Sequence, residues 1–140
     1  MRCGVLRANL VVVNKARREM LLLRGNSILR SYRIALGREP VGPKLQEGDG
    51  RTPEGRYTID RRNPRSKYHL SLHISYPDAR DVARAGEAGL DPGGDIMIHG
   101  LKDGVHVAGD WTQGCIAVTD AEMDEIWSLV PDGTDIVIDP

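Results

Sequence analysis

The feature that most constrains the fold is the shortness of the apolar runs, each of which is bounded by turn-forming residues. Runs over 10–13, 19–23 and 28–36 are rich in β-branched and aliphatic residues, and polar turns separate them. Gly25 and Asn26, which both tolerate positive φ angles, stand between the second and third runs and indicate a β-hairpin. Short strands joined by tight turns favour an antiparallel meander over βαβ units. The pattern therefore predicts a mainly β fold.

The rest of the chain combines further strand patterns with one long loop and two helical segments. Glycine and proline residues punctuate 37–55, which predicts a long loop, and loops of this length in compact domains are commonly functional. Thr119 and Glu122 form a capping box, a signature of a helix N-terminus. Strands are expected at 56–60, 69–75, 95–99 and 135–139, and helices at 78–88 and from 119 to about 130. We expect residues 1–140 to form a single domain with one or two short helices.

The composition argues against several classes of protein. The chain has 19 Lys and Arg residues against 20 Asp and Glu, a net charge of −1, whereas a nucleic-acid-binding domain normally shows a basic face. The longest apolar stretches, at 10–13 and 20–23, are far too short to span a bilayer, so no membrane span is expected. The histidines and cysteines show no CxxC or HExxH spacing, and neither a metal nor a cofactor is expected.

Cys115 and His99 carry the clearest chemical signal. Cys115 follows Gly114, and His99 stands upstream at the end of a strand pattern. A thiol nucleophile needs a base, which an imidazole supplies, and a preceding glycine allows a sharp turn that brings backbone amides to a substrate carbonyl. Either residue alone can be structural, as a buried thiol or a core imidazole. Their joint occurrence favours a cysteine acyltransferase. Cys3 lacks glycine and histidine neighbours and is expected to be inert.

Two ordered blocks of residues add a resemblance to a known family. The first block is Ile98-His99-Gly100, and the second is Thr112-x-Gly114-Cys115-Ile116. Upstream, the segment 47–57 contains the element Thr-Pro-Glu-Gly-Arg-Tyr. Together they resemble the L,D-transpeptidase catalytic domain family, called YkuD or ErfK/YbiS/YcfS/YnhG. The similarity runs from roughly Leu10 to Ile138.

The resemblance implies a β-sandwich of mixed sheets and a role for each motif residue. By that correspondence Cys115 is the nucleophile and His99 the general base. The carbonyl of Gly100 would orient His99, and the amides of Gly114 and Cys115 would line the oxyanion hole. Substrate contacts are expected from Trp111, Thr112, Gln113 and Tyr57. Lys44, Arg51 and Arg56 flank the long loop, either as solvated charges or as partners for carboxylates of a peptide stem.

The same resemblance implies the substrate and the reaction. Family members act on peptidoglycan stem peptides, in cell wall biogenesis and cell shape, and carbapenem-type inhibitors are expected to react with the thiol. The thiol attacks the bond after an L-centre, usually at diaminopimelate, and releases D-alanine. An amine or water then takes the acyl group. The expected protein is a monomer that acts in the periplasm or cell envelope.

Two departures from the family pattern leave the second half of the reaction open. Gln113 stands where many members have histidine, and Ala117 where most have arginine. The version of the motif at 114–120, Gly-Cys-x-Ala-Val-Thr-Asp, which ends with Thr119 and Asp120, resembles a branch that includes a hydrolase releasing peptidoglycan-bound lipoprotein. L,D-carboxypeptidase or hydrolase activity on cross-links or lipoprotein attachments is therefore one alternative. A non-catalytic peptidoglycan-binding domain is another, against which the intact His99 and Cys115 pair argues.

The amino terminus does not carry a recognisable secretory signal. The residues 1–5 are followed by no apolar segment with a small-residue cleavage site. Two expectations follow: either the protein works in the cytoplasm, or the sequence shown is a trimmed part of a longer chain.

Overall fold

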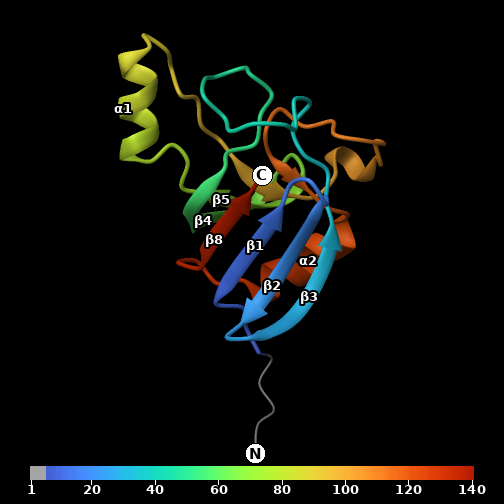
Figure 1. The fold of residues 1–140 in the computed structure, drawn as a ribbon. Coiled ribbons are helices and arrows are strands. Elements are labelled where there is room, and N and C mark those ends of the chain that lie inside the picture. Colours follow the sequence, from blue (N-terminus) through green and yellow to red (C-terminus); the bar gives the residue numbers. More distant parts are fainter. Residues whose placement is uncertain (1–5) are drawn as a thin grey trace, which may run out of the picture.

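The first three strands form the expected meander. In the computed structural model, which describes residues 6–140, β1 (Leu10–Asn14) pairs antiparallel with β2 (Glu19–Arg24), and β2 with β3 (Ser27–Arg33), as Figure 1 shows. Gly25 adopts a φ of 58° in the turn between β2 and β3, which confirms the predicted hairpin. The prediction for Cys3 lies outside the described residues.

Strands dominate the remainder of the chain as well. Within residues 6–140, the other strands are β4 (Gly55–Ser66), β5 (His69–Ile74), β6 (Met97–His99), β7 (Ile116–Ala117) and β8 (Asp135–Asp139). The helices of this part of the chain are α1 (Ala79–Glu87), α2 (Asp120–Leu129) and the 3₁₀ helix η1 (Lys102–Gly104).

All the strands belong to one curled, mixed sheet. Its order is β3-β2-β1-β8-β4-β5-β6-β7. The β1–β8 and β6–β7 pairs are parallel, and the other neighbours are antiparallel. The sheet curls far enough for its two ends to meet, because Ala35, just after β3, forms an antiparallel bridge with Ala117 of β7. The expectation of a mainly β fold with mixed pairing is confirmed.

β4 is longer than the sequence predicts, because it serves both halves of the sheet. Its first residues pair with β8, and its remainder pairs with β5. The charged segment after Asp60 lacks an apolar alternation, yet the backbone of β5 supplies its hydrogen-bonding partners. Pro64, which cannot donate a hydrogen bond, lies inside the irregular step of register between Asn63 and Ser66. Pairing thus extends a strand that side-chain pattern alone ends at Asp60.

The interior of the curl is one apolar core to which both halves of the sheet contribute. Val11 and Leu22 from one half and Leu72 and Ile98 from the other are fully buried in the same cluster. Burial of such side chains removes apolar surface from water and drives folding. The two short strands β6 and β7 are therefore held against the same core as the meander.

The two helices occupy different positions relative to the sheet (Figure 1). α2 packs against β5 through a buried face of Met123, Ile126 and Leu129, and the predicted capping box of Thr119 and Glu122 is confirmed at its start. α1 stands at one side of the sheet's upper end, with Asp78 as its N-cap. No helix among residues 6–140 has the length and apolar character needed to cross a membrane.

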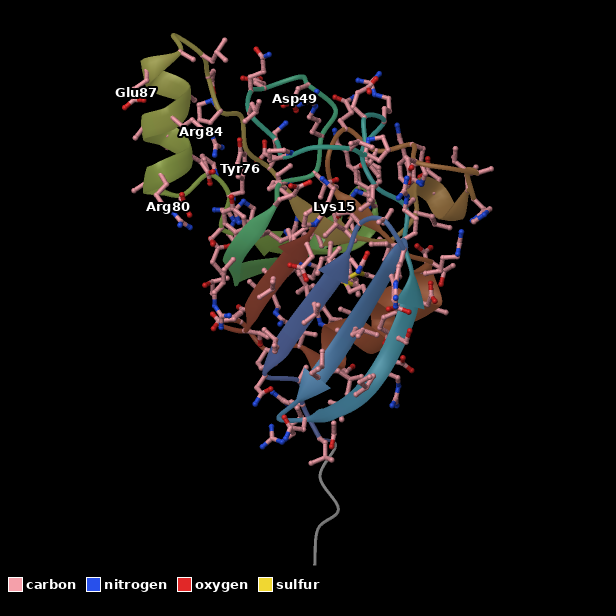
Figure 2. All side chains as sticks on the ribbon, in the orientation of Figure 1. Lys15, Asp49, Tyr76, Arg80, Arg84 and Glu87 are labelled. Atoms are coloured by element: carbon pink, nitrogen blue, oxygen red, sulfur yellow. The ribbon has the colours of Figure 1, made fainter. Side chains whose placement is uncertain are left out.

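The long loop between β3 and β4 is ordered by a buried lysine that the sequence pattern does not reveal. Lys15 follows β1, is 2% exposed, and donates from Nζ to the carbonyls of Gly42 (2.9 Å) and Thr52 (2.7 Å) and to Glu54 Oε2 (3.1 Å). Figure 2 shows Lys15 at the top of the sheet, beneath the loop that carries Asp49. Burial lowers the pKa of Lys15, and the hydrogen bond and charge of Glu54 oppose that shift. One ammonium group thus joins the middle of the loop to its end before β4.

A second buried lysine orders the tip of the same loop. Lys44 donates to Asp49 Oδ1 at 2.9 Å, and the Asp49 carboxylate also accepts from the amides of Leu45, Gln46 and Arg51. Burial alone would raise the pKa of Asp49, but these donors lower it. Lys44 is therefore a structural cation rather than one of the solvated or substrate-binding charges that were expected at this position.

Loss of the Lys15 ammonium is expected to destabilise the fold strongly. Lys15→Ala leaves the Glu54 carboxylate and two carbonyls without their donor, and breaking such a buried pair costs about 3 kcal/mol. Urea unfolding measures the difference from wild type. Lys67→Ala, at an exposed turn between β4 and β5, is the matched control and should change stability little. An equal effect of the two substitutions would contradict the role given to Lys15.

Candidate active site

Cys115 is presented by a turn that only glycine can make. Gly114 has a φ of 131°, and a Cβ at this position would lie 2.7 Å from the carbonyl oxygen of Arg51. Both the left-handed conformation and the close backbone approach exclude a side chain. The turn ends directly before β7, so the sulfur lies at the start of a strand whose backbone is fixed by the sheet.

Thr112 holds this turn from below. Its hydroxyl accepts a hydrogen bond from the Gly114 amide at 3.1 Å and donates one to the Cys115 carbonyl at 2.7 Å, and the residue is 3% exposed. The only hydroxyl of Thr112 is thus used inside the turn, and its contact with substrate stays a prediction. Thr112 is a positioning residue for the thiol.

The segment after β3 forms backbone hydrogen bonds with the turn that carries Cys115. The Thr112 amide donates to the Leu36 carbonyl (3.2 Å), and the Arg38 amide donates to the Thr112 carbonyl (3.0 Å). Gly37 lies between them, where a Cβ would approach the Gly50 carbonyl oxygen to 2.1 Å. The cysteine turn is thus packed between the start of the β3–β4 loop at 36–38 and the later part of the same loop at Gly50 and Arg51. No larger residue fits at Gly37.

His99 lies on β6, on the same face of the sheet as Cys115. The parallel register places Ile98 opposite Ile116 and His99 opposite Ala117. Because side chains alternate along a strand, His99, Ala117 and Cys115 share one face. The His99 Nδ1 is 2.7 Å from the Gly100 carbonyl oxygen, so the neutral ring carries its proton on Nδ1 and leaves Nε2 as the proton acceptor.

Two aromatic rings enclose the imidazole. Tyr68 stacks on His99 with ring centroids 4.2 Å apart and an angle of 20°, and Trp111 contacts it at 5.8 Å and 54°. The Tyr68 carbonyl also accepts from the Gly100 amide at 2.9 Å. Trp111 was expected to wall the cleft and is half-buried beside His99. Tyr68 lies in the turn between β4 and β5.

Gly100 and the residue after it are held by the start of α2. The Asp120 carboxylate accepts from the Leu101 amide at 2.8 Å, and a Cβ on Gly100 would lie 2.5 Å from Asp120 Oδ1. Thr119 and Asp120, which distinguish the branch variant of the motif, therefore act on the helix cap and on the loop after His99.

Burial sets the protonation states of the reactive pair. It lowers the pKa of His99, against the opposing effect of the Gly100 carbonyl, and it raises the pKa of the Cys115 thiol. Sγ lies 3.3 Å from the Asp95 carbonyl oxygen, a contact that suits an S–H donor. Both shifts favour an uncharged thiol and an uncharged imidazole at rest, so a thiolate–imidazolium pair would form only as substrate is attacked.

The remaining expected site residues lie in different environments. Gln113 is exposed beside the thiol. Tyr57 is 6% exposed, donates its hydroxyl to Asp81 Oδ2 at 2.8 Å and packs edge-on against Tyr76. The ring and hydroxyl of Tyr57 thus attach α1 to the sheet, and its contact with substrate stays a prediction. Figure 2 shows Tyr76 beside that helix.

An ion pair ties the cysteine turn to the meander. Arg18, in the β1–β2 turn, donates to Asp110 through Nε (3.1 Å) and Nη2 (2.8 Å), and Asp110 also accepts from the Leu36 amide at 3.0 Å. Burial alone would raise the pKa of Asp110, but the guanidinium and the amide lower it. The pair fixes the residue before Trp111. Within residues 6–140 no group of three or more potential metal-ligating side chains was found.

The fold and the site together define a class of protein, and comparison with known proteins identifies the family. A cysteine on a glycine turn beside an oriented imidazole has the parts of a thiol acyl-transfer site. A family model for the L,D-transpeptidase catalytic domain, YkuD, matches residues 8–138. The chain belongs to this family.

Individual relatives agree with this assignment. The putative L,D-transpeptidase YafK of Escherichia coli K12 is 36% identical over 105 residues, which cover 74% of this chain and 37% of the relative. The structure of the helical cell shape determining protein Pgp2 from Campylobacter jejuni has a TM-score of 0.73 at 26% identity, covering 92% of this chain and 46% of that one. Mycobacterium tuberculosis L,D-transpeptidase 1 shares the fold, with a TM-score of 0.61 at 12% identity, covering 94% of this chain and 60% of that one. The chain thus spans less than half the length of the first two relatives.

The protonation state of Cys115 has a direct chemical readout. Since burial raises the pKa of the thiol, we expect alkylation by iodoacetamide to rise with pH and to reach its midpoint above about 8.5, the value of an ordinary thiol. Mass spectrometry of the Cys3→Ala protein follows Cys115 alone. A reaction rate that is already at its plateau below pH 7 would indicate a preformed thiolate–imidazolium pair and contradict this account.

Removal of the Thr112 hydroxyl is expected to slow acylation of the thiol. Thr112→Val keeps the volume but leaves the Gly114 amide and Cys115 carbonyl without their partner, which costs about 1–3 kcal/mol of stability. Thr134→Val is the matched control, because Thr134 is also buried and donates to the Pro131 carbonyl, away from the turn. Stopped-flow measurement of β-lactam acylation should show slowing in Thr112→Val only. Equal rates in both variants would refute a positioning role.

Proposed function

We propose that this chain is a cysteine acyltransferase of peptidoglycan, with Cys115 as nucleophile and His99 as general base. The observation that carries the proposal is that both side chains lie on one face of the sheet, the thiol on a glycine turn and the imidazole oriented by the Gly100 carbonyl. Family membership supports the peptidoglycan substrate and a site of action in the periplasm or cell envelope. The single-domain organisation and the monomeric state stay predictions.

The first half-reaction is acylation of the thiol. As Sγ attacks the carbonyl of the L-centre of a stem peptide, its proton passes to Nε2 of His99. The C–S bond forms, the oxyanion is stabilised by the amides of Gly114 and Cys115, and the C–N bond then breaks. His99 returns the proton to the departing amine, which leaves as D-alanine. The uncharged resting pair makes proton transfer part of this step rather than a precondition for it.

The second half-reaction transfers the acyl group to an amine, which gives L,D-transpeptidation at diaminopimelate. Hydrolysis by water is the alternative, as an L,D-carboxypeptidase or on cross-links and lipoprotein attachments. We retain the hydrolysis alternative because neither Gln113 nor Ala117 offers a titratable or cationic group near the acyl-enzyme. The branch-specific Thr119 and Asp120 do not discriminate, since both have structural roles.

Product analysis after incubation with purified sacculi tests this function. We expect wild type to release D-alanine and form new cross-links, and Cys115→Ala to be inactive. Cys3→Ala is the matched control and should retain activity. Release of D-alanine without new cross-links would assign the hydrolase alternative.

Acylation by a carbapenem tests the enzyme against a non-catalytic binding domain. We expect one adduct per chain by intact mass, located at Cys115 and lost in Cys115→Ala. The absence of any adduct, together with unchanged muropeptides, would refute the enzymatic proposal.

A further inference from the structure

The imidazole of His99 has to carry a positive charge during the proposed reaction, although its surroundings disfavour one. The residue is 3% exposed, and burial lowers its pKa. A general base nevertheless takes the thiol proton as Sγ of Cys115 attacks, so an imidazolium forms at a place removed from water. The groups that surround the ring therefore decide how readily this charge appears.

No acidic side chain of the described residues, 6–140, is bonded to His99. Its Nδ1 contacts the neutral Gly100 carbonyl at 2.7 Å, in the position that an aspartate takes in a serine protease triad. The histidine–carboxylate pairs of this part of the chain are His69–Asp124 and His73–Asp60. The carbonyls of Gly100 and of His99 itself oppose the effect of burial on the pKa of His99. An imidazolium here thus lacks the anionic partner that a triad supplies.

The charged groups on the elements next to His99 either have partners of their own or face water. The Asp120 carboxylate, at the start of α2, accepts from the Leu101 amide at 2.8 Å. The paired groups nearby are Arg18–Asp110, His69–Asp124 and the Thr119–Glu122 capping box. The exposed ones, in the loop after Gly100, are Lys102, Asp103 and His106.

The face of an aromatic ring covers one side of the imidazole instead. The ring centroids of Tyr68 and His99 are 4.2 Å apart, and their planes differ by 20°. The face of an aromatic ring is negative and attracts a cation that lies within about 6 Å of its centroid. Trp111 lies at 5.8 Å but is tilted by 54°, so it presents its face less directly. Tyr68 is therefore the ring placed to interact with an imidazolium.

The stack also fixes the direction of the reactive nitrogen. The Gly100 carbonyl holds Nδ1 within the plane of the imidazole, and the Tyr68 ring fixes the plane itself. Because a ring that is stacked face to face keeps its edge free, Nε2 can still accept and return a proton. Two contacts thus orient His99 without occupying the nitrogen that reacts.

The backbone of Tyr68 is tied to the end of β6 and, through the next residue, to α2. The Tyr68 carbonyl accepts from the Gly100 amide at 2.9 Å. His69 has a φ of 74°, and its Nε2 lies 2.6 Å from Asp124 Oδ1 on α2. The turn between β4 and β5 is attached on both sides, which keeps the Tyr68 ring over the imidazole.

We propose that the face of Tyr68 stabilises the imidazolium that His99 becomes while Cys115 is acylated, so that Tyr68 is a positioning residue that acts through His99. The proposal deepens the proposed function and rests on it. No bond forms or breaks at Tyr68. The thiol proton moves to Nε2, the aromatic face stabilises the charge that the imidazole gains, and the same proton then leaves with the departing amine.

The rate of acylation by a carbapenem, measured by stopped flow, tests this role. Tyr68→Phe keeps the aromatic face and should react like wild type, whereas Tyr68→Leu keeps apolar bulk without the face and should react about tenfold more slowly. Trp127→Leu is the matched control, because Trp127 is a half-buried aromatic residue on α2 that contacts Arg62 at 4.7 Å. It should keep the wild-type rate.

A series of fluorinated phenylalanines at position 68 separates the electrostatic effect from packing. Each added fluorine withdraws electron density from the ring face with little change of shape, so we expect the acylation rate to fall stepwise from phenylalanine to its mono-, di- and trifluorinated forms. Thermal unfolding of each protein shows that the fold is retained. Equal rates across the series would overturn the proposal.

A second readout does not depend on the reaction. In the Cys115→Ala protein, NMR titration should give a lower pKa for His99 with Tyr68→Leu than with Tyr68→Phe, because loss of the aromatic face destabilises the charged ring. The same pKa in both would contradict the stabilising role. A wild-type protein that does not react with the carbapenem would refute the proposed function, whereas this comparison would still test the stack.

Discussion

The site depends on the backbone pairing that closes the curled sheet. The amides of Ala35 and Ala117 donate to each other's carbonyls at 2.9 Å, and the neighbouring Thr112 is bonded on both sides to the segment after β3. β7 is only two residues long, and without this pairing it would be an edge strand held on one side by β6. The closure therefore supports the backbone next to Cys115, and it joins the first strands of the chain to the proposed nucleophile far along the sequence.

Buried and half-buried charged side chains stabilise the other segments that surround the site. The ammonium groups of Lys15 and Lys44 order the long loop, and the Arg18–Asp110 pair anchors the residue before Trp111. The reactive pair itself is kept uncharged by burial. Ion pairs thus lie around the site, whereas burial favours the uncharged forms of Cys115 and His99.

Local chemistry in the sequence predicted much of this arrangement, and long-range pairing explains most of what it missed. The glycine turn at 25–26 and the capping box at 119–122 act within a few residues, so the pattern alone indicates them. Lys15 reads as a surface residue because its three acceptors are brought to it by a distant loop. Likewise, Thr112 matches a substrate-binding position in a motif, whereas the folded turn uses its hydroxyl for the backbone. The attachment of Tyr57 to Asp81 of α1 is equally a long-range contact that the sequence pattern does not reveal.

The central claim is that the thiol of Cys115 becomes an acyl carrier. Intact mass spectrometry of the wild-type protein, quenched within the first turnovers on a stem tetrapeptide, measures this directly. The account predicts a mass increase equal to the tripeptide acyl group, located by fragmentation at Cys115. No adduct during turnover, or an adduct on another residue, would contradict it.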